Sequence, residues 1–125
     1  MAGERILVVD DEIDITDLLR DLLEAESYVV DTAPDASAAL QLIRQNIYEI
    51  ALLDFNLPDM DGVMLHHQIR LIDAELASHT IFMSGLLQSE GNLGYYMSHR
   101  AGFLAKPFDI AEVLQQVRAL LAEEA

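Results

Sequence analysis

Carboxylates, one hydroxyl and one ammonium group directly follow short apolar runs of this chain, where strands of a sheet would end. They belong to Asp10, Asp11, Asp54, Ser84 and Lys106. Two carboxylates about 4 Å apart repel each other by about 4 kcal/mol at an effective dielectric constant of 20. Three carboxylates that meet at one edge of a sheet therefore need a cation or protons between them.

The donor set favours a hard divalent cation and a phosphate group. Oxygen ligands without His or Cys at the strand ends select Mg²⁺ or Mn²⁺ over zinc, and Mg²⁺ that keeps several waters is the form that binds phosphates. Lys106 is the only lysine among seven cationic residues, and its ammonium supplies a point charge for a phosphoryl oxygen. Ser84 supplies one hydrogen-bond donor. We therefore predict a magnesium-dependent phosphate site.

The elements that must position these groups alternate between strands and helices. Continuous apolar runs predict strands buried on both faces, as in a parallel sheet. The predicted strands are 6–9, 28–32, 50–53, 80–83 and 103–105. Amphipathic helices are predicted over 15–23, 36–43, 65–72 and 110–121. This alternation indicates an α/β fold with an open, doubly wound parallel sheet, whose ligand crevice lies beyond the carboxyl ends of the strands.

Local signals indicate where several helices begin, and they make one predicted helix less stable. Asp35 follows a proline, and Asp109 stands three residues before Glu112 in the spacing of a capping box. Asp59 and Asp61 are interpreted as turn and helix-capping residues. A fourth helix is expected within 88–100, but two glycines there each cost roughly 0.5–1 kcal/mol relative to alanine. We expect that helix to be short, late-starting or mobile.

Composition limits the possible functions. The 125 residues, 52% of them apolar, suit one domain spanning 1–125. A formal charge of −15 repels nucleic acid and anionic lipid, so direct nucleic-acid binding is not expected. The absence of cysteine excludes disulfides and thiolate metal sites. No apolar run reaches the ~20 residues that cross a bilayer, and we expect a cytoplasmic protein with no membrane contact.

Four motifs together resemble the receiver domain of response regulators. They are Val8-Val9-Asp10-Asp11, the segment from Leu52-Leu53-Asp54 to Asp61-Gly62, Met83-Ser84-Gly85 and Lys106-Pro107-Phe108. The resemblance covers essentially the whole chain, with spacings that fit without insertion. It implies a CheY-like, flavodoxin-like (βα)5 fold whose five parallel strands have the order 2-1-3-4-5.

The resemblance also implies roles for individual residues. Asp54 matches the phosphoacceptor, which takes a phosphoryl group from a sensor histidine kinase or a phosphotransfer protein. Asp11, Asp54 and the backbone carbonyl of Asn56 would ligate Mg²⁺ (or Mn²⁺) directly, and Asp10 would act through water. Lys106 would pair with a phosphoryl oxygen. The domain would thus catalyse only its own phosphorylation and dephosphorylation, and it would not be an enzyme in the ordinary sense.

A switch follows from the same resemblance. Ser84 would move toward the new phosphoryl group, and Phe103 would enter the space that Ser84 leaves. This movement would reshape the face formed by helix four, strand five and helix five. An effector domain or a second copy of the chain would dock on that face.

Two other functions compete with this interpretation. An aspartate-nucleophile phosphohydrolase also begins with a strand that ends in acids, but the Asp-x-Asp expected at that strand end is absent, since Asp10 is followed by Asp11-Glu12. An interaction domain of the same fold that is never phosphorylated would not need the full set of acids and Lys106. Flavin binding is disfavoured because no Ser/Thr/Gly-rich phosphate loop follows the first strand. The four histidines are expected to have solvated or structural roles.

Overall fold

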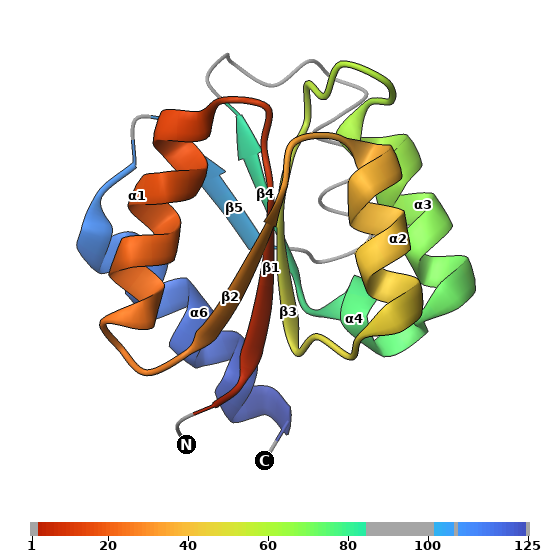
Figure 1. Cartoon of the computed structure of the whole chain (residues 1–125). Helices are drawn as coiled ribbons and strands as arrows, with labels where there is room; N and C mark the ends of the chain where they lie inside the picture. The colour runs from red at the N-terminus through yellow and green to blue at the C-terminus, as the bar shows by residue number, and fades with distance from the viewer. Residues whose placement is uncertain (1–2, 85–101, 107, 125) are drawn as a thin grey trace.

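The protein is a three-layer α/β structure built on one parallel sheet (Figure 1). The computed structural model describes residues 3–84, 102–106 and 108–124. The strands are β1 (Arg5–Val9), β2 (Val29–Ala33), β3 (Ile50–Asp54), β4 (Thr80–Ser84) and β5 (Gly102–Ala105). Their order is β2-β1-β3-β4-β5, and all neighbours are parallel. The predicted fold class and strand order are confirmed.

Helices cover both faces of the sheet. They are α1 (Ile13–Glu24), α2 (Ala36–Gln45), α3 (Gly62–Ile72), α4 (Ala74–Ser78) and α6 (Ile110–Glu124). Figure 1 shows α1 and α6 on one face and α2, α3 and α4 on the other. Because side chains alternate along a strand, Ile6 and Val8 pack in the α1/α6 core whereas Leu7 and Val9 pack in the α2/α3/α4 core. The central strands are thus buried on both faces, as their continuous apolar runs predict.

Most of the predicted strands and helices are one to three residues longer in the structure, and two elements differ in other ways. Strand β2 covers 29–33 rather than 28–32. The short helix α4 was not predicted, because five residues are too few to show a helical stripe. It begins after Asp73, whose carboxylate accepts a hydrogen bond from Leu76 N at 3.1 Å and so starts a new helix directly after α3. The helix expected within 88–100 lies outside the described residues.

The register brings the carboxyl ends of four strands to one edge of the sheet. Val9 is paired with both Ala33 and Leu53, and Asp54 is paired with Met83. Beyond β5, Lys106 N donates a hydrogen bond to Ser84 O at 2.8 Å. Asp10 after β1, Asp54 at the end of β3 and Lys106 after β5 therefore meet at this edge, as predicted.

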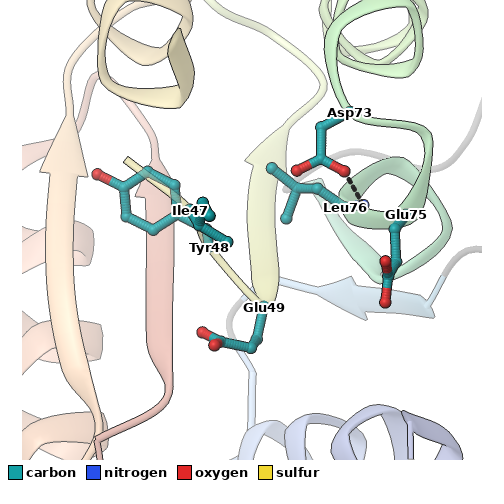
Figure 2. A pocket seen from close by; sticks show the side chains of 6 residues that line it. All are labelled: Ile47, Tyr48, Glu49, Asp73, Glu75 and Leu76. Carbon is teal, nitrogen blue, oxygen red and sulfur yellow. Dashed lines mark hydrogen bonds between the residues drawn. The ribbon is translucent and has the colours of Figure 1, made fainter. Parts of the chain in front are cut away.

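A shallow pocket of about 180 Å³ lies at the opposite, amino-terminal end of the sheet (Figure 2). We call it the amino-end pocket; it is lined by Ile47, Tyr48, Glu49, Asp73, Glu75 and Leu76. The segments that form it precede β3 and β4, so it is separated from the strand-end acids by the length of the sheet.

Candidate functional site

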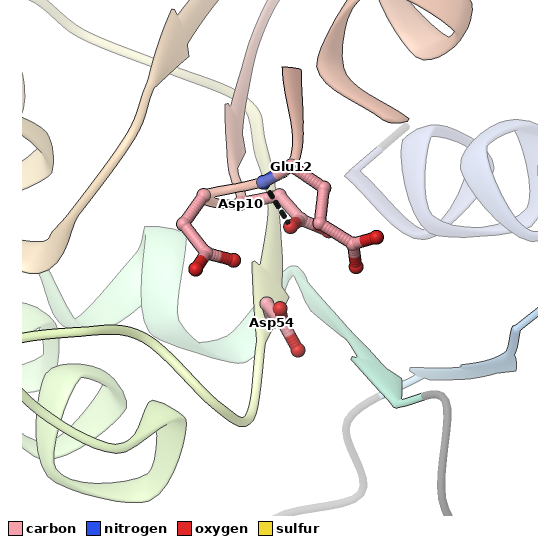
Figure 3. Close-up of side chains that lie close together, drawn as sticks. Asp10, Glu12 and Asp54 are labelled. Carbon is pink, nitrogen blue, oxygen red and sulfur yellow. Dashed lines mark hydrogen bonds between the residues drawn. The ribbon is translucent and has the colours of Figure 1, made fainter. Parts of the chain in front are cut away.

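The end of β1 directs one carboxylate into the protein and leaves two at the surface. Asp10 is 1% exposed, and its backbone N donates to Ala33 O at 3.1 Å. Glu12 N donates to Asp10 Oδ1 at 3.0 Å, which fixes the inward orientation of that carboxylate (Figure 3). Asp11 and Glu12 are exposed. One carboxylate oxygen from each of these three residues and from Asp54 lies within 4.8 Å of the others.

Asp54, the last residue of β3, is buried beside this group. It is 4% exposed, and its Oδ1 accepts a hydrogen bond from Asn56 N at 3.2 Å. Burial raises the pKa of Asp54 to about 6, and the nearby charge of Asp10 acts in the same direction. The backbone hydrogen bond and Lys106 oppose that rise in pKa. At neutral pH the carboxylate is therefore ionised but poorly solvated, which favours its attack on an electrophile.

Lys106 places its ammonium among the carboxylates. Its Nζ lies 2.7 Å from Asp10 Oδ2, 3.1 Å from Glu12 Oε1 and 3.3 Å from Asp54 Oδ2. Its side chain is only 11% exposed. Burial by itself would lower the pKa of Lys106, but the contacts with Asp10 and Glu12 and the charge of Asp54 raise it above its ordinary value. Lys106 is thus a permanent cation. We call Asp10, Asp11, Glu12, Asp54 and Lys106 the carboxyl-end rim.

The rim fits a divalent metal ion. Four carboxylates converge, and one ammonium offsets only part of their charge. Asp10 Oδ2 is buried, and the Lys106 ammonium lies 2.7 Å from it. An all-oxygen donor set of this kind suits Mg²⁺ or Mn²⁺. Because the four carboxylates share a single ammonium, the rim keeps excess negative charge that such an ion would offset.

The loop between β3 and α3 is closed tightly beside Asp54. Gly62 N donates to Phe55 O at 2.8 Å, and Asn56 forms an antiparallel bridge with Asp61. A Cβ atom at Gly62 would lie 2.6 Å from the Asp54 carbonyl oxygen, so only glycine fits there without a shift of the backbone. The loop thereby holds the backbone of Asn56 close to the phosphoacceptor candidate.

Two aspartates of this loop cap helices, as the sequence suggested. Asp61 Oδ1 accepts from Met64 N at 2.8 Å and caps α3. Asp59 instead accepts two hydrogen bonds from another helix, α2: Ala36 N donates to its Oδ1 at 2.9 Å and Ser37 N to its Oδ2 at 3.0 Å. The bond from Ala36 is the main cause of the lowered pKa of Asp59. The cap predicted at Asp109 is also present, with Ala111 N donating to Oδ1 at 2.9 Å.

The two switch candidates lie on β4 and β5. Ser84 is buried at the end of β4 and is paired with Ala105. Phe103 is half-buried and paired with Phe82, and its ring centroid lies 6.4 Å from that of Phe55. Phe55 in turn stacks on Phe82 at 4.7 Å. Phe55, the residue after Asp54, is thus in aromatic contact with both β4 and β5.

Most of the predicted site residues lie together, and one participant was missed. Asp10, Asp11, Asp54 and Lys106 meet in the rim, and Asn56 and Ser84 lie at the same edge. Glu12 was not predicted, although it continues the acidic pair and its Oε1 contacts Lys106. His66 has the expected structural role, since it is buried with Nε2 2.7 Å from Ala77 O.

The family model of the response regulator receiver domain matches residues 6–118. The chain belongs to this receiver family. Its fold agrees with a receiver domain protein from Methanospirillum hungatei, with a TM-score of 0.89 and 29% identity over 98% of this chain and 96% of that one. A two-component response regulator from Clostridium difficile has a TM-score of 0.86 and 25% identity, over 96% and 97% of the two chains.

Curated relatives fall into two sizes. An uncharacterized 14.6 kDa protein of Leptolyngbya boryana is 33% identical over 94% of this receiver and 90% of its own length. The transcriptional regulatory protein ResD of Bacillus subtilis is also 33% identical over 94% of this receiver, which spans 48% of ResD. The chain thus covers about half the length of such regulators.

Membership of the family establishes a general role. Receivers are the signalling domains of two-component response regulators, which work with histidine kinases, and they bind divalent metal ions. Within the described part of this receiver, no helix is long and apolar enough to cross a membrane.

Proposed function

We propose that this receiver accepts a phosphoryl group on Asp54 from a phosphohistidine of a sensor histidine kinase or a phosphotransfer protein. An Asp54 carboxylate oxygen forms the new bond to phosphorus while the bond from phosphorus to the imidazole nitrogen breaks. The histidine keeps the electron pair of that bond and takes up a proton. The product is an acyl phosphate on Asp54 and a free histidine on the donor.

The observation that carries this proposal is the buried Asp54 carboxylate with a lysine ammonium 3.3 Å away. A phosphate dianion could not approach the acidic rim without compensating charge. Lys106 supplies one positive charge beside Asp54, where it would pair with an oxygen of the phosphoryl group. Asp10, Asp11, Asp54 and the Asn56 carbonyl would hold Mg²⁺, directly or through water. The ion would supply the remaining charge and orient the phosphoryl oxygens.

Signal output would follow from the phosphoryl group. Phosphorylation adds about −1.5 to −2 charges and three acceptor oxygens, which would draw the Ser84 hydroxyl toward Asp54. Phe103 would then leave its contact with Phe55 for the space that Ser84 vacates. The phosphoryl contacts would favour this second state and shift the population toward it. The face that would change includes β5 and α6, where an effector domain or a second copy would dock. Such signalling from an ATP-dependent kinase would take place in the cytoplasm.

Acetyl phosphate with Mg²⁺, followed by intact mass measurement, tests the proposal. The wild type should gain the mass of one phosphoryl group, and Asp54→Ala should gain none. Asp14→Asn, which changes an exposed carboxylate of α1, is the matched control and should be phosphorylated like the wild type. Chelation of the metal should abolish the adduct.

Three results would contradict this function. An adduct that persists in Asp54→Ala would place the phosphoryl group elsewhere. Steady release of inorganic phosphate over many turnovers, with no adduct at any time, would favour the phosphohydrolase alternative. Absence of both adduct and hydrolysis, from acetyl phosphate and from a phosphohistidine donor alike, would favour an interaction domain that is never phosphorylated.

A further inference from the structure

The loop that carries Asn56 is attached to a helix that has no other role at the rim. The Asp59 carboxylate accepts one hydrogen bond at each oxygen, from Ala36 N at 2.9 Å and from Ser37 N at 3.0 Å. Both donors belong to the first turn of α2, where backbone N–H groups have no partner within the helix. The two bonds join segments that are more than twenty residues apart in the sequence. We call this pair of bonds the Asp59 clamp.

Helix α2 already has a cap of its own. Asp35 is the N-cap residue, and its Oδ1 accepts a hydrogen bond from Ala38 N at 2.8 Å. Asp35 thus satisfies one free N–H group, and Asp59 satisfies two others from outside the helix. The two carboxylates differ in one respect. Among the described residues the Asp35 carboxylate is bonded only to its own helix, whereas Asp59 links the helix to the loop after the phosphoacceptor.

The loop is held at its base as well as at its tip. At the base, Gly62 N bonds to Phe55 O, and Asn56 pairs with Asp61. Asn56 N also bonds to the Asp54 carboxylate. At the tip, the Asp59 clamp is the anchor to α2. A loop fixed at both places presents the Asn56 carbonyl in one direction, whereas a loop fixed only at its base can rotate that peptide group.

We propose that Asp59 is a positioning residue for the metal ion: by anchoring the loop tip to α2 it orients the Asn56 carbonyl toward the rim. This inference rests on the proposed function, since it concerns the same Mg²⁺. Residues that orient a ligand without touching the metal commonly change its affinity about 10- to 100-fold when they are replaced. The Asp59 clamp acts on a single carbonyl ligand, so an effect near the lower limit is expected.

Mg²⁺ titration of the unphosphorylated protein by calorimetry tests the inference without any catalytic readout. Asp59→Ala removes both bonds and should weaken Mg²⁺ binding about 10-fold. Asp35→Ala is the matched control, because it removes one charge and one cap from the same helix end but leaves the loop attached. It should bind Mg²⁺ within about 2-fold of the wild type. Asp59→Asn loses the same charge but keeps one acceptor oxygen, so its affinity should lie between those of Asp59→Ala and the wild type.

Amide hydrogen exchange without metal reports on the clamp itself. The Ala36 and Ser37 amides should be protected in the wild type and in Asp35→Ala, and should lose protection in Asp59→Ala. Unprotected amides in the wild type would show that the clamp does not form, whatever the metal affinity.

The remaining outcomes are equally decisive. Wild-type affinity in Asp59→Ala would overturn the positioning role, as would an equal loss in Asp35→Ala, which would assign the effect to charge or to α2 stability. Should Asp59→Ala fail to fold, Asp59→Asn carries the comparison, and an affinity equal to the wild type would overturn the role. A wild type that binds no Mg²⁺ would refute the metal requirement of the proposed function and the positioning role with it. This outcome is distinguishable from a failure of the positioning role alone, because it is observed in the wild type and not only in a variant.

Discussion

The carboxyl-end rim and the amino-end pocket are both acidic, yet only the rim has the character of a reaction site. In the pocket, Glu49 Oε2 accepts a hydrogen bond from Arg5 N at 2.6 Å, and Asp73 Oδ1 accepts one from Leu76 N. The third carboxylate there, Glu75, is exposed to solvent. In the rim, Asp10 and Asp54 are almost fully buried and share one ammonium with Glu12.

The difference shows that an excess of acid does not make a site by itself. A carboxylate that is solvated or bonded to a backbone N–H is already satisfied and has little affinity left for a cation. Two buried carboxylates that share one lysine keep unsatisfied negative charge, and burial makes that charge costly. With a formal charge of −15, the chain carries many carboxylates, and burial distinguishes Asp10 and Asp54 from those that are exposed.

The largest effect should come from removing the shared cation. Lys106→Met leaves Asp10 and Asp54 buried without an ammonium, and breaking such a buried pair costs about 3–4 kcal/mol. The free energy of unfolding from urea denaturation, with chelator at neutral pH, should fall by about that amount. Arg44→Met, which removes an exposed cation of α2, should change it by less than about 0.5 kcal/mol. Equal stability of the two variants would contradict the view that Lys106 compensates buried charge.

The second-largest effect is expected at Gly62, where two segments of backbone approach each other closely. The Cβ of Gly62→Ala would lie 2.6 Å from Asp54 O and 2.8 Å from Phe55 Cα, both backbone atoms that cannot move aside independently. We expect a loss of about 2–3 kcal/mol in unfolding free energy and weaker Mg²⁺ binding, because the strain acts on Asp54 and its loop. Gly102→Ala is the comparison, since its nearest atom is the end of the Gln116 side chain. A greater loss in Gly102→Ala would refute the argument.

The ionisation of Asp54 should be visible in the pH dependence of stability. Its pKa is about 6 in the folded protein against an ordinary value of 3.8, so the folded state binds more protons between these values. Stability without metal should therefore fall as pH rises from about 4 to about 6. Asp54→Asn removes this loss and should be more stable than the wild type by on the order of 2 kcal/mol above pH 6, with no gain near pH 4. Urea denaturation at the two pH values measures it. A gain that persists at low pH would point to packing instead of charge.

The sequence predicted the sheet well because burial on both faces leaves a local signature. A run such as Ile50-Ala51-Leu52-Leu53, which is short and ends at a charged residue, is typical of a strand buried on both faces, and the polar residue that ends each run marks the rim. The strand order came from the resemblance to receivers, since local patterns do not define pairing. The one-residue shift of β2 reflects a strand with an exposed first residue and a weaker apolar pattern.

What the sequence could not show depends on contacts between distant residues. Glu12 shares an ammonium with Asp10 and Asp54 through Lys106, which is 94 residues later in the sequence. Asp59 was interpreted as a turn or cap residue, and its partners on α2 are 22 and 23 residues earlier. Asp73 caps helix α4, but a helix of five residues is too short to show a periodic apolar pattern in the sequence. Charge and capping propensity were visible in each case, but the partner was not.

The smallest predicted effect compares two capping aspartates, one at each end of the sheet. Asp73 caps α4 beside the amino-end pocket, and Asp61 caps α3 beside the rim. Replacing either by alanine removes one bond to a backbone N–H and should lower the unfolding free energy by about 1 kcal/mol. Only Asp61→Ala should also weaken Mg²⁺ binding, by a factor of about three, because Asp61 is paired with Asn56 in the loop that supplies a metal ligand.

Urea denaturation and Mg²⁺ calorimetry on the same two variants complete that comparison. Asp73→Ala controls for the loss of one charge and one cap, so any further change in Asp61→Ala is due to its place beside the rim. If both variants bind Mg²⁺ equally well, the loop tolerates a frayed α3 and the tip anchor at Asp59 alone is sufficient to orient it. If Asp73→Ala weakens Mg²⁺ binding as much as Asp61→Ala does, the two ends of the sheet are coupled, and the contrast between rim and pocket fails.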